Sequence, residues 1–254
     1  MKTINRFVPF ILLFALTGCN TVEGQTTEVR SFSGIDSVAL LGSGDVDISI
    51  GNKEEITIHA PADLIPYLLT EKKGGTLYIG KRKKGWKKFR HINENIHYDL
   101  VVKELTHISV SGSGDIEAEK LTGEKCSVKI SGSGNIEVDQ IHSNKVKVTV
   151  SGSGDIDVDN LSADFLGVSI NGSGDIDLDG KTDELDVTIS GSGYFTGNEL
   201  ESENVSVNIY GSGDARVWAT ESLDVHISGS GDVIYHGDPS VNSRTTGSGN
   251  VRHR

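Results

Sequence analysis

The chain contains few prolines and cysteines, and these shortages narrow the possible folds. Its 254 residues include 4 prolines and 2 cysteines, against 31 glycines and a formal net charge of -12. The glycines do not recur at every third residue, which excludes a collagen-like chain, so we expect them to mark turns or repeats. With Cys19 modified as argued below, Cys126 has no partner, and an intrachain disulfide is excluded.

The N-terminus has the features of a bacterial export signal. Lys2 and Arg6 precede a short apolar run over 7–16, which is too short to cross a bilayer. The following Leu16-Thr17-Gly18-Cys19 resembles the lipobox of lipoproteins, which implies cleavage before Cys19 and lipidation of its thiol. Asn20 rather than aspartate follows, which by the same resemblance favours the outer membrane. No second segment of spanning length is present, so we expect a soluble protein held by its lipid.

A Gly-Ser-Gly motif recurs along the rest of the chain. It begins at Gly42, Gly112, Gly132, Gly152, Gly172, Gly191, Gly211, Gly229 and Gly247. After a first step of 70 residues, the steps are 20, 20, 20, 19, 20, 18 and 18 residues. Aliphatic and polar residues alternate on both sides of each motif, which is typical of half-buried strands. One such unit cannot bury its apolar side alone, but stacked copies make a continuous core.

The repeat therefore predicts an all-β, right-handed parallel β-helix with coils of about 18–20 residues and an irregular N-terminal β cap. Each Gly-Ser-Gly would form a corner, because glycine reaches positive φ without steric cost. A phosphate-binding loop is disfavoured, since no Lys-Ser/Thr and no helix follow the motif. A calcium-binding nonapeptide ladder is disfavoured by its shorter period. Cys126 falls in an aliphatic column, which predicts a buried thiol.

The part before residue 111 is less regular. Strands are predicted over 55–59, 77–81 and 96–102, with a Lys-Lys-Gly-Gly turn at 72–75 closing a hairpin and a short helical turn over 64–69. The 70-residue step is interpreted as wider coils plus a cap. At the other end, Ser243 and Thr245 occupy inward positions, as expected of a terminal coil. We thus divide the chain into a signal peptide (1–18), a lipidated tether (19–27), an N-terminal β region with the first coil (28–110) and regular coils (111–254).

The repeated V-x-V/I-S-G-S-G-D/N-I/V-x-V pattern, together with GSGDVDISIG and EEITIHAPADLIPYLLTEKKGGTLYI, resembles a known family over roughly residues 30–254. This is the putative auto-transporter adhesin family with a head GIN domain, a domain of unknown function. The resemblance implies a right-handed β-helix and a surface or envelope role. It implies no catalytic residues and no established ligand.

The outward positions after four successive corners carry eleven carboxylates and one asparagine. In the predicted stack they form a grid made of Asp115, Glu117, Glu119, Asn135, Glu137, Asp139, Asp155, Asp157, Asp159, Asp175, Asp177 and Asp179. One interpretation is solubility and resistance to lateral association. The alternative is a face for a cationic partner or for loose, multi-site Ca²⁺ binding, because Ca²⁺ needs six to eight oxygen ligands. No cofactor is expected, and no confident metal site is found.

Two further surfaces are candidates for contact. Tyr194, Arg216 and Trp218 replace the acids in later coils and are candidates for stacking on sugar rings, the alternative being ordinary cross-strand packing on a solvated face. The run KRKKGWKKFR interleaves aromatic residues with cations and suggests contact with an anionic surface rather than nucleic acid, the alternative being a solvated loop. Its candidate residues are Lys81, Arg82, Lys83, Lys84, Trp86, Lys87, Lys88 and Arg90.

Together these patterns predict a non-catalytic, adhesin-like or structural lipoprotein of the cell envelope, with a cell-surface glycan or an envelope protein as partner. The main alternative is a polysaccharide lyase or hydrolase, because such enzymes also use β-helices. That alternative is disfavoured because the carboxylates form a uniform, open lattice rather than a pair in different environments. A third alternative is an envelope scaffolding lipoprotein with a protein partner.

Overall fold

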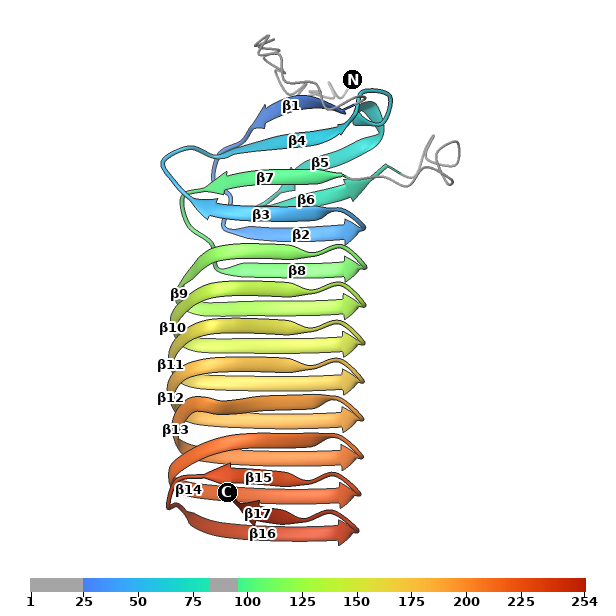
Figure 1. Ribbon diagram of the computed structural model, residues 1–254. Coiled ribbons are helices and arrows are strands. Elements are labelled where there is room, and N and C mark those ends of the chain that lie inside the picture. Colours follow the sequence, from blue (N-terminus) through green and yellow to red (C-terminus); the bar gives the residue numbers. More distant parts are fainter. Residues whose placement is uncertain (1–24, 83–95) are drawn as a thin grey trace, which may run out of the picture.

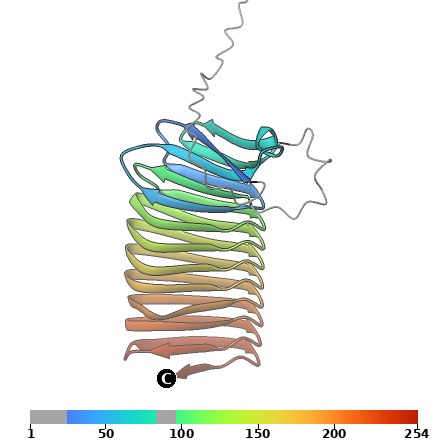
Figure 2. The same cartoon turned by 45° about the horizontal axis from the view of Figure 1, so that its top comes forward.

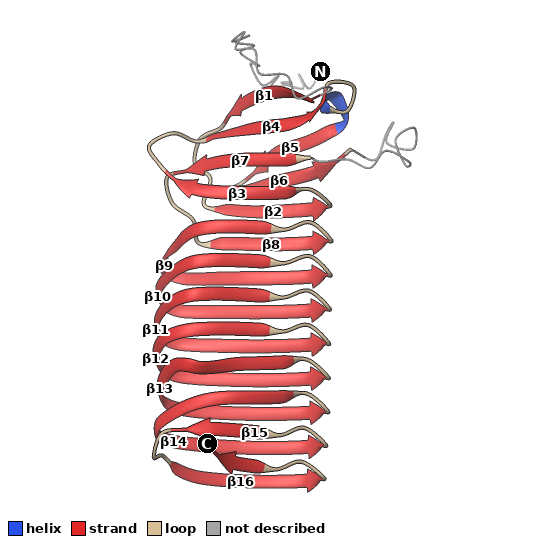
Figure 3. Ribbon diagram, viewed as in Figure 1, coloured by secondary structure: helices blue, strands red, loops and turns tan. Residues whose placement is uncertain are grey.

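The structure, a computed structural model, is a solenoid of stacked β-coils, and it describes residues 25–82 and 96–254. The chain winds as a right-handed helix along one long axis, as is usual for parallel connections (Figure 1). Almost every element is a strand, and the one described helix is a short 3₁₀ turn, η1 (Ile65–Tyr67) (Figure 3). No helix among the described residues is long and apolar enough to cross a membrane.

The regular coils are built from long strands that bend once and return. Their bounds are β9 (Ile116–Gly132), β10 (Ile136–Gly152), β11 (Ile156–Gly172), β12 (Ile176–Gly191), β13 (Tyr194–Gly211) and β14 (Asp214–Gly229). Each strand pairs in parallel with its neighbours, so that Ile136 lies beside Ile116 and Ile156. The predicted coils of 18–20 residues are confirmed, and every coil contributes one leg to each of two facing sheets.

The core lies between those two sheets. Alternate residues of both legs point inward, and the resulting columns are fully buried, as at Ile156, Val158 and Leu161 on one side and Leu166, Val168 and Ile170 on the other. Burial of each such side chain contributes about 1.5–3 kcal/mol to folding. Cys126 is 3% exposed within this core. Burial raises the pKa of its thiol, and the predicted buried position of Cys126 is confirmed.

The corners explain why glycine occurs twice in each motif. The first glycine has positive φ, for example +136° at Gly152, which other residues rarely adopt. A Cβ on the second glycine, Gly154, would lie 2.0 Å from the carbonyl oxygen of Gly134 in the preceding coil. Between them, the Ser153 N–H donates to the carbonyl oxygen of Gly132 at 2.9 Å. The first glycine therefore meets a conformational need, and the second permits close stacking of successive backbones.

Small residues fill the inside of the opposite bend. Ser143, Ala163, Thr182 and Ser202 stack in one buried column. The buried hydroxyls donate to nearby backbone carbonyls: Ser143 Oγ to the oxygen of Lys145 at 3.1 Å and Thr182 Oγ1 to that of Glu184 at 3.1 Å. Each hydroxyl is therefore hydrogen-bonded inside the apolar core, which avoids the cost of burying an unpaired polar group.

The N-terminal region caps one end of the solenoid (Figure 2). It comprises β1 (Gln25–Ser31), β2 (Ser37–Gly42), β3 (Asp45–Ile50), β4 (Glu55–Pro61), β5 (Leu68–Lys73), β6 (Thr76–Lys81), β7 (His97–Val102) and β8 (His107–Gly112). The predicted strands and the hairpin at 72–75, formed by antiparallel β5 and β6, are confirmed. Strand β1, which pairs antiparallel with β4, was not predicted.

The 70-residue step was interpreted as wider coils plus a cap, and it contains one turn of this kind, in which β6 and β7 stack in parallel on the two legs of the first coil. Strand β8 pairs directly with β2, and Gly112 lies on Gly42 just as in later coils. The intervening residues leave the stack and return, and they extend both sheets beyond the first coil through β6 and β7, which pair with β2 and β3. The outermost pairs, β4 with β7 and β5 with β6, are antiparallel. The insertion therefore closes the end of the core.

A buried carboxylate ties the cap together. Glu54 is 8% exposed and accepts hydrogen bonds from the backbone N–H groups of Ile35 at 2.7 Å and Gly34 at 3.0 Å. These bonds, assisted by Lys103, lower the pKa of the Glu54 carboxyl. Its stabilising contribution is therefore present above the ordinary glutamate pKa and is lost as the pH falls through the lowered value.

The far end of the solenoid is open and polar. It consists of β15 (Val233–His236), β16 (Ser240–Gly247) and β17 (Val251–His253), and every residue of β16 is exposed. Ser243 and Thr245 stack on the buried Val225 and Ile227. The predicted polar terminal coil is confirmed.

Candidate functional site

The predicted grid of acids is present on one side of the solenoid. We define the acidic face as the outward positions of the first legs of β9–β12 and of the corner residue before each. Its members are Asp115, Glu117, Glu119, Asn135, Glu137, Asp139, Asp155, Asp157, Asp159, Asp175, Asp177 and Asp179. Glu137 lies in register between Glu117 and Asp157, and Asp157 is followed by Asp177. Because paired strands are about 4.8 Å apart, like charges stack at that spacing.

The column next to the corners has a structural role that the sequence reasoning missed. Asp155 Oδ1 accepts the backbone N–H of Asp175 at 2.9 Å, and Asn135 Oδ1 accepts that of Asp155 at 3.2 Å. The same bond continues from Asp175 to the N–H of Tyr194 and recurs from Asp232 to Asn250. Aspartate and asparagine both supply this oxygen, and their interchange at one repeat position was the available signal. The first role of these side chains is therefore to accept a backbone hydrogen bond from the next coil.

The central column is the longest continuous row of acids. It consists of Asp99, Asp47, Glu117, Glu137, Asp157 and Asp177, because β7 and β3 extend the same sheet beyond β9. Within 25–82 and 96–254, no lysine or arginine forms an ion pair with any of these six side chains. The row is thus a line of carboxylates that crosses from the cap into the regular coils, and among the described residues only histidines, at Asp47 and Asp99, form ion pairs with it.

Mutual repulsion and crowding show in the titration of this face. Partial loss of hydration, followed by repulsion from neighbouring carboxylates, raises the pKa of Glu137, Asp157, Asp177 and Asp179. All four shifts have the same direction and the same kind of cause. The lattice therefore holds its charge at a cost to stability.

The opposite side of the coils has a different chemistry. We define the polar face as the outward positions of the second legs of β9–β12. It consists of Ser127, Lys129, Ser131, Lys147, Thr149, Ser151, Gly167, Ser169, Asn171, Asp186, Thr188 and Ser190. These positions stack in the same register as the acids, yet three of the twelve are charged. Backbone stacking alone therefore does not require an acidic surface.

The aromatic candidates lie further along the acidic side, in two groups. The Arg216 guanidinium lies over the Tyr194 ring at 5.9 Å, and Arg216 pairs with Thr196 as expected. An unbroken repeat would place Trp218 beside Asn198, but the structure does not. The register shifts after Gly197, so that Trp218 lies beside Glu201 at the bend and packs edge-on against His236 at 5.3 Å. The register shifts because the coil that contains β14 has fewer residues than the coil before it.

The basic candidate segment falls mostly outside the described residues. Lys83, Lys84, Trp86, Lys87, Lys88 and Arg90 lie there, as do the lipobox and Cys19. Lys81 ends β6, and its Nζ donates to Ser43 Oγ at 2.9 Å, while Arg82 follows directly. The segment joins β6 to β7, so it connects the two sheets of the cap.

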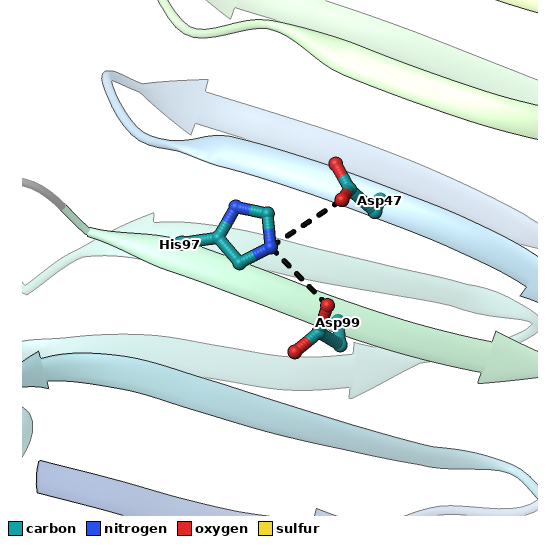
Figure 4. Close-up of side chains that lie close together, drawn as sticks. All are labelled: Asp47, His97 and Asp99. Carbon is teal, nitrogen blue, oxygen red and sulfur yellow. Dashed lines mark hydrogen bonds and ion pairs between the residues drawn. The ribbon is translucent and has the colours of Figure 1, made fainter. Parts of the chain in front are cut away.

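A histidine–aspartate cluster lies where the cap meets the coils, and the sequence did not reveal it (Figure 4). His97 Nε2 lies 3.4 Å from Asp47 Oδ2 and 3.2 Å from Asp99 Oδ1. His59 Nε2 contacts the other oxygen of Asp99 at 2.6 Å. These histidines looked scattered because they come from β4 and β7, whose pairing could not be predicted. The alternations Asp45-x-Asp47 and His97-x-Asp99 were the only local signal.

Comparison with known proteins identifies relatives of the whole fold. The family model described as "Putative auto-transporter adhesin, head GIN domain" matches residues 34–156 and 127–239. No curated protein matches the chain. Among solved structures, a "putative lipid binding protein" from Parabacteroides distasonis is 28% identical with a TM-score of 0.83, and the match covers 92% of this chain and 98% of that one.

Two structures described as putative adhesins show the same fold at lower identity. One from Parabacteroides merdae is 23% identical with a TM-score of 0.81, covering 92% of this chain and 97% of that one. One from Parabacteroides distasonis is 24% identical with a TM-score of 0.84, covering 91% and 97%. The solenoid with its closed cap is therefore an architecture that several proteins share.

Proposed function

The chain belongs to the putative auto-transporter adhesin family with a head GIN domain, and from this we propose that it is a non-catalytic, adhesin-like binding protein of the bacterial cell envelope. We propose further that a lipid on Cys19 tethers it to the outer membrane and that the acidic face makes the contact. The names of its relatives support the adhesin-like role. The proposed partner is a cationic protein or polymer on a neighbouring surface.

One observation carries the choice of face: the central column of six carboxylates has no lysine or arginine ion partner among the described residues. A sheet that needed only solubility would be served by mixed charges. Here carboxylates repel one another at each step of the stack, by roughly 1 kcal/mol per pair in water. A partner that brings positive charge relieves this repulsion, and the free energy released contributes to binding.

Binding to charged surfaces tests the proposal directly. Full-length protein in detergent is passed over surfaces coated with polylysine or with polyglutamate, at several salt concentrations. We expect retention on polylysine only, decreasing as salt screens the charges. Equal retention on both surfaces, or retention that is insensitive to salt, would contradict an electrostatic contact. Added Ca²⁺ separates the alternative of loose cation bridging, for which retention on polyglutamate would rise.

The anchoring proposal needs a separate experiment. Cells that express the full chain or Cys19→Ser are fed a radiolabelled fatty acid and fractionated. We expect label and outer-membrane recovery for the unaltered chain and neither for Cys19→Ser. Protease added to intact cells then reports whether the solenoid faces outward. A labelled Cys19→Ser protein would refute the anchor at this residue.

A glycan is the second candidate ligand, favoured by the stacking of Arg216 on the exposed ring of Tyr194 and by the half-buried Trp218. Aromatic faces of this kind bind sugar rings. A glycan array probed with the full chain, Tyr194→Ala and Trp218→Ala tests it, with Tyr210→Ala, an exposed tyrosine on the second leg of β13, as a matched control. Signals lost equally in all three variants would exclude this patch as the site.

Two alternatives to a binding role, a polysaccharide-active enzyme and a scaffolding lipoprotein, can each be tested by a further experiment. Turnover on a panel of polysaccharides, abolished by a single aspartate substitution, would replace the binding role with an enzymatic one. Recovery of one defined envelope protein by crosslinking in whole cells would favour a scaffolding role. Contact of the segment 81–90 with anionic lipid stays a proposal, and vesicles with and without anionic lipid test it through charge removal at Lys81 and Arg82.

A further inference from the structure

The histidine–aspartate cluster at the junction of cap and coils has the chemistry of a metal centre. Four side chains meet on the outer surface of three adjacent strands: Asp47 on β3, His97 and Asp99 on β7, and His59 on β4. The pairing of these strands makes the cluster, because Asp47 lies beside Asp99 and His59 lies beside His97. The strands are held by the sheet, so the ligand atoms lie on a fixed framework.

The geometry points to a divalent transition-metal site in which Asp47, His97 and Asp99 each supply one ligand atom. These three atoms all lie within 4.8 Å of one another. Metal–ligand bonds of about 2.0–2.2 Å place neighbouring ligands of a tetrahedral ion roughly 3.3–3.6 Å apart. The distances of 3.4 Å and 3.2 Å from His97 Nε2 to the two carboxylates match that spacing.

The fourth residue orients the site. His59 Nε2 lies 2.6 Å from Asp99 Oδ2, the oxygen that does not face His97. The ligand atoms that all lie within 4.8 Å of one another belong to Asp47, His97 and Asp99, so His59 stands beside this set rather than within it. A hydrogen bond to the outer oxygen of a ligating carboxylate fixes its direction and tunes affinity. We therefore assign His59 as a positioning residue and not as a ligand.

The donor set selects the class of ion. One imidazole and two carboxylates suit Zn²⁺, Co²⁺, Ni²⁺ or Mn²⁺ better than Ca²⁺, which prefers six to eight oxygens. The side chains of His97, Asp47 and Asp99 are 38%, 50% and 50% exposed, so an ion held by three protein ligands would keep a position open to solvent. Glu117 and Asp45 lie beside the cluster in the sheet and add negative charge, which attracts a cation.

Calorimetric titration of the full chain in detergent with Zn²⁺ and with Co²⁺ tests the site. We expect one saturable site per chain, together with a rise in melting temperature when Zn²⁺ is added. Co²⁺ should shift the imidazole proton resonances of His97 strongly, because it is paramagnetic. His97→Ala should abolish the saturable site, and Asp47→Asn should weaken it at least tenfold. His142→Ala and Asp183→Asn, which alter an exposed histidine and an exposed aspartate away from the cluster, should leave it intact.

His59→Ala distinguishes positioning from ligation. We expect about tenfold weaker binding with unchanged stoichiometry and with the Co²⁺ shift of His97 retained. Loss of that shift would overturn the assignment of His59. Circular dichroism confirms that each variant is folded, as expected for substitutions on an outer surface. Absence of saturable binding, or binding that survives His97→Ala, would overturn the site and leave the proposed adhesin-like role untouched.

Discussion

The acidic face and the polar face belong to the same coils and share one core, yet their side chains differ. Asp157 and Ser169 lie on one strand, point outward, and each stacks on its equivalents in the neighbouring coils. On the acidic side these neighbours repel one another, and on the polar side they are mostly uncharged. The comparison shows that inward positions and corners determine the fold, whereas outward columns are free to vary. Because the fold does not require the repelling carboxylates on one side of the coils, we explain them by a binding role of that side.

The largest expected effect comes from a substitution at a Gly-Ser-Gly corner, because both faces depend on the stacking of successive coils. Gly154→Ala adds a Cβ that would lie 2.0 Å from the carbonyl oxygen of Gly134, so successive coils must separate. We expect a loss of about 3 kcal/mol in the free energy of unfolding. Gly167→Ala is the control, because its Cβ meets only the Phe165 ring at 3.3 Å. Chemical denaturation measures both, and equal losses would refute the stacking requirement.

The next largest effect comes from converting the polar face into an acidic one. Thr149, Ser169 and Thr188 stack in register across three coils, and replacing all three by aspartate creates two neighbouring like-charge pairs. We expect a loss of about 2 kcal/mol in the free energy of unfolding at low salt, decreasing as salt is added. The corresponding triple asparagine variant should lose much less. A salt-independent loss would mean that charge is not its cause.

A smaller effect separates structure from charge within the acidic face. Asp155 Oδ1 accepts the N–H of Asp175, so Asp155→Ala should cost about 1 kcal/mol of unfolding free energy. Asp155→Asn keeps the acceptor and removes the charge, so it should be neutral or slightly stabilising. Thermal unfolding of the two variants measures the difference. Equal destabilisation by alanine and asparagine would show that the charge, and not the hydrogen bond, matters at this position.

The smallest effect is a dependence of stability on pH. The pKa values of Glu137, Asp157, Asp177 and Asp179 are raised in the folded state, so the folded protein binds more protons than the unfolded chain within that window. Stability should therefore fall as the pH rises from the ordinary carboxyl pKa through the raised values. After solvent screening we expect a fraction of a kcal/mol.

Denaturation midpoints measured from pH 7 down to the ordinary carboxyl pKa test this dependence, because the opposite contribution of Glu54 is lost only below the ordinary glutamate pKa. The variant with Glu137→Gln, Asp157→Asn, Asp177→Asn and Asp179→Asn should show a flatter profile. Stability that rises with pH in this range for the unaltered chain would mean that the acids do not repel as described.

The regular part of the fold could be predicted because its signal is local and repeated. The period of the glycines and the alternation of Val168 and Ile170 with polar residues determine the coil, the corner and the core column together. The insertion after the first coil has no repeat, and its strands pair partly antiparallel. From the sequence alone, nothing showed that β8 would return onto β2. The terminal coil at Ser243 was predictable because it breaks a known pattern.

The candidate sites differ in the same way, because some follow from the repeat and others depend on strand pairing outside it. The stacking of Glu137 on Asp157 followed from the period, whereas the His97 cluster depends on pairing between β3, β4 and β7 and was missed. Trp218 was misplaced because its coil is shorter and the register shifts before it. The role of Asp155 as an acceptor was missed because an outward acid was interpreted only by its charge. The period of the repeat predicts which side chains stack in one column. Register shifts between strands and individual hydrogen bonds can be determined only from the structure.

The comparison between faces is tested most directly by two variants with equal charge. One carries Glu117→Gln, Glu137→Gln, Asp157→Asn and Asp177→Asn on the acidic face. The other carries Asp183→Asn, Glu184→Gln, Asp186→Asn and Glu203→Gln, four exposed acids outside that face. Retention of each full-length variant on a polylysine surface is measured at physiological salt. We expect the first variant to lose most of its retention on polylysine and the second to keep nearly all of it. Equal losses of retention would show that net charge, rather than the stacked acidic face, makes the contact.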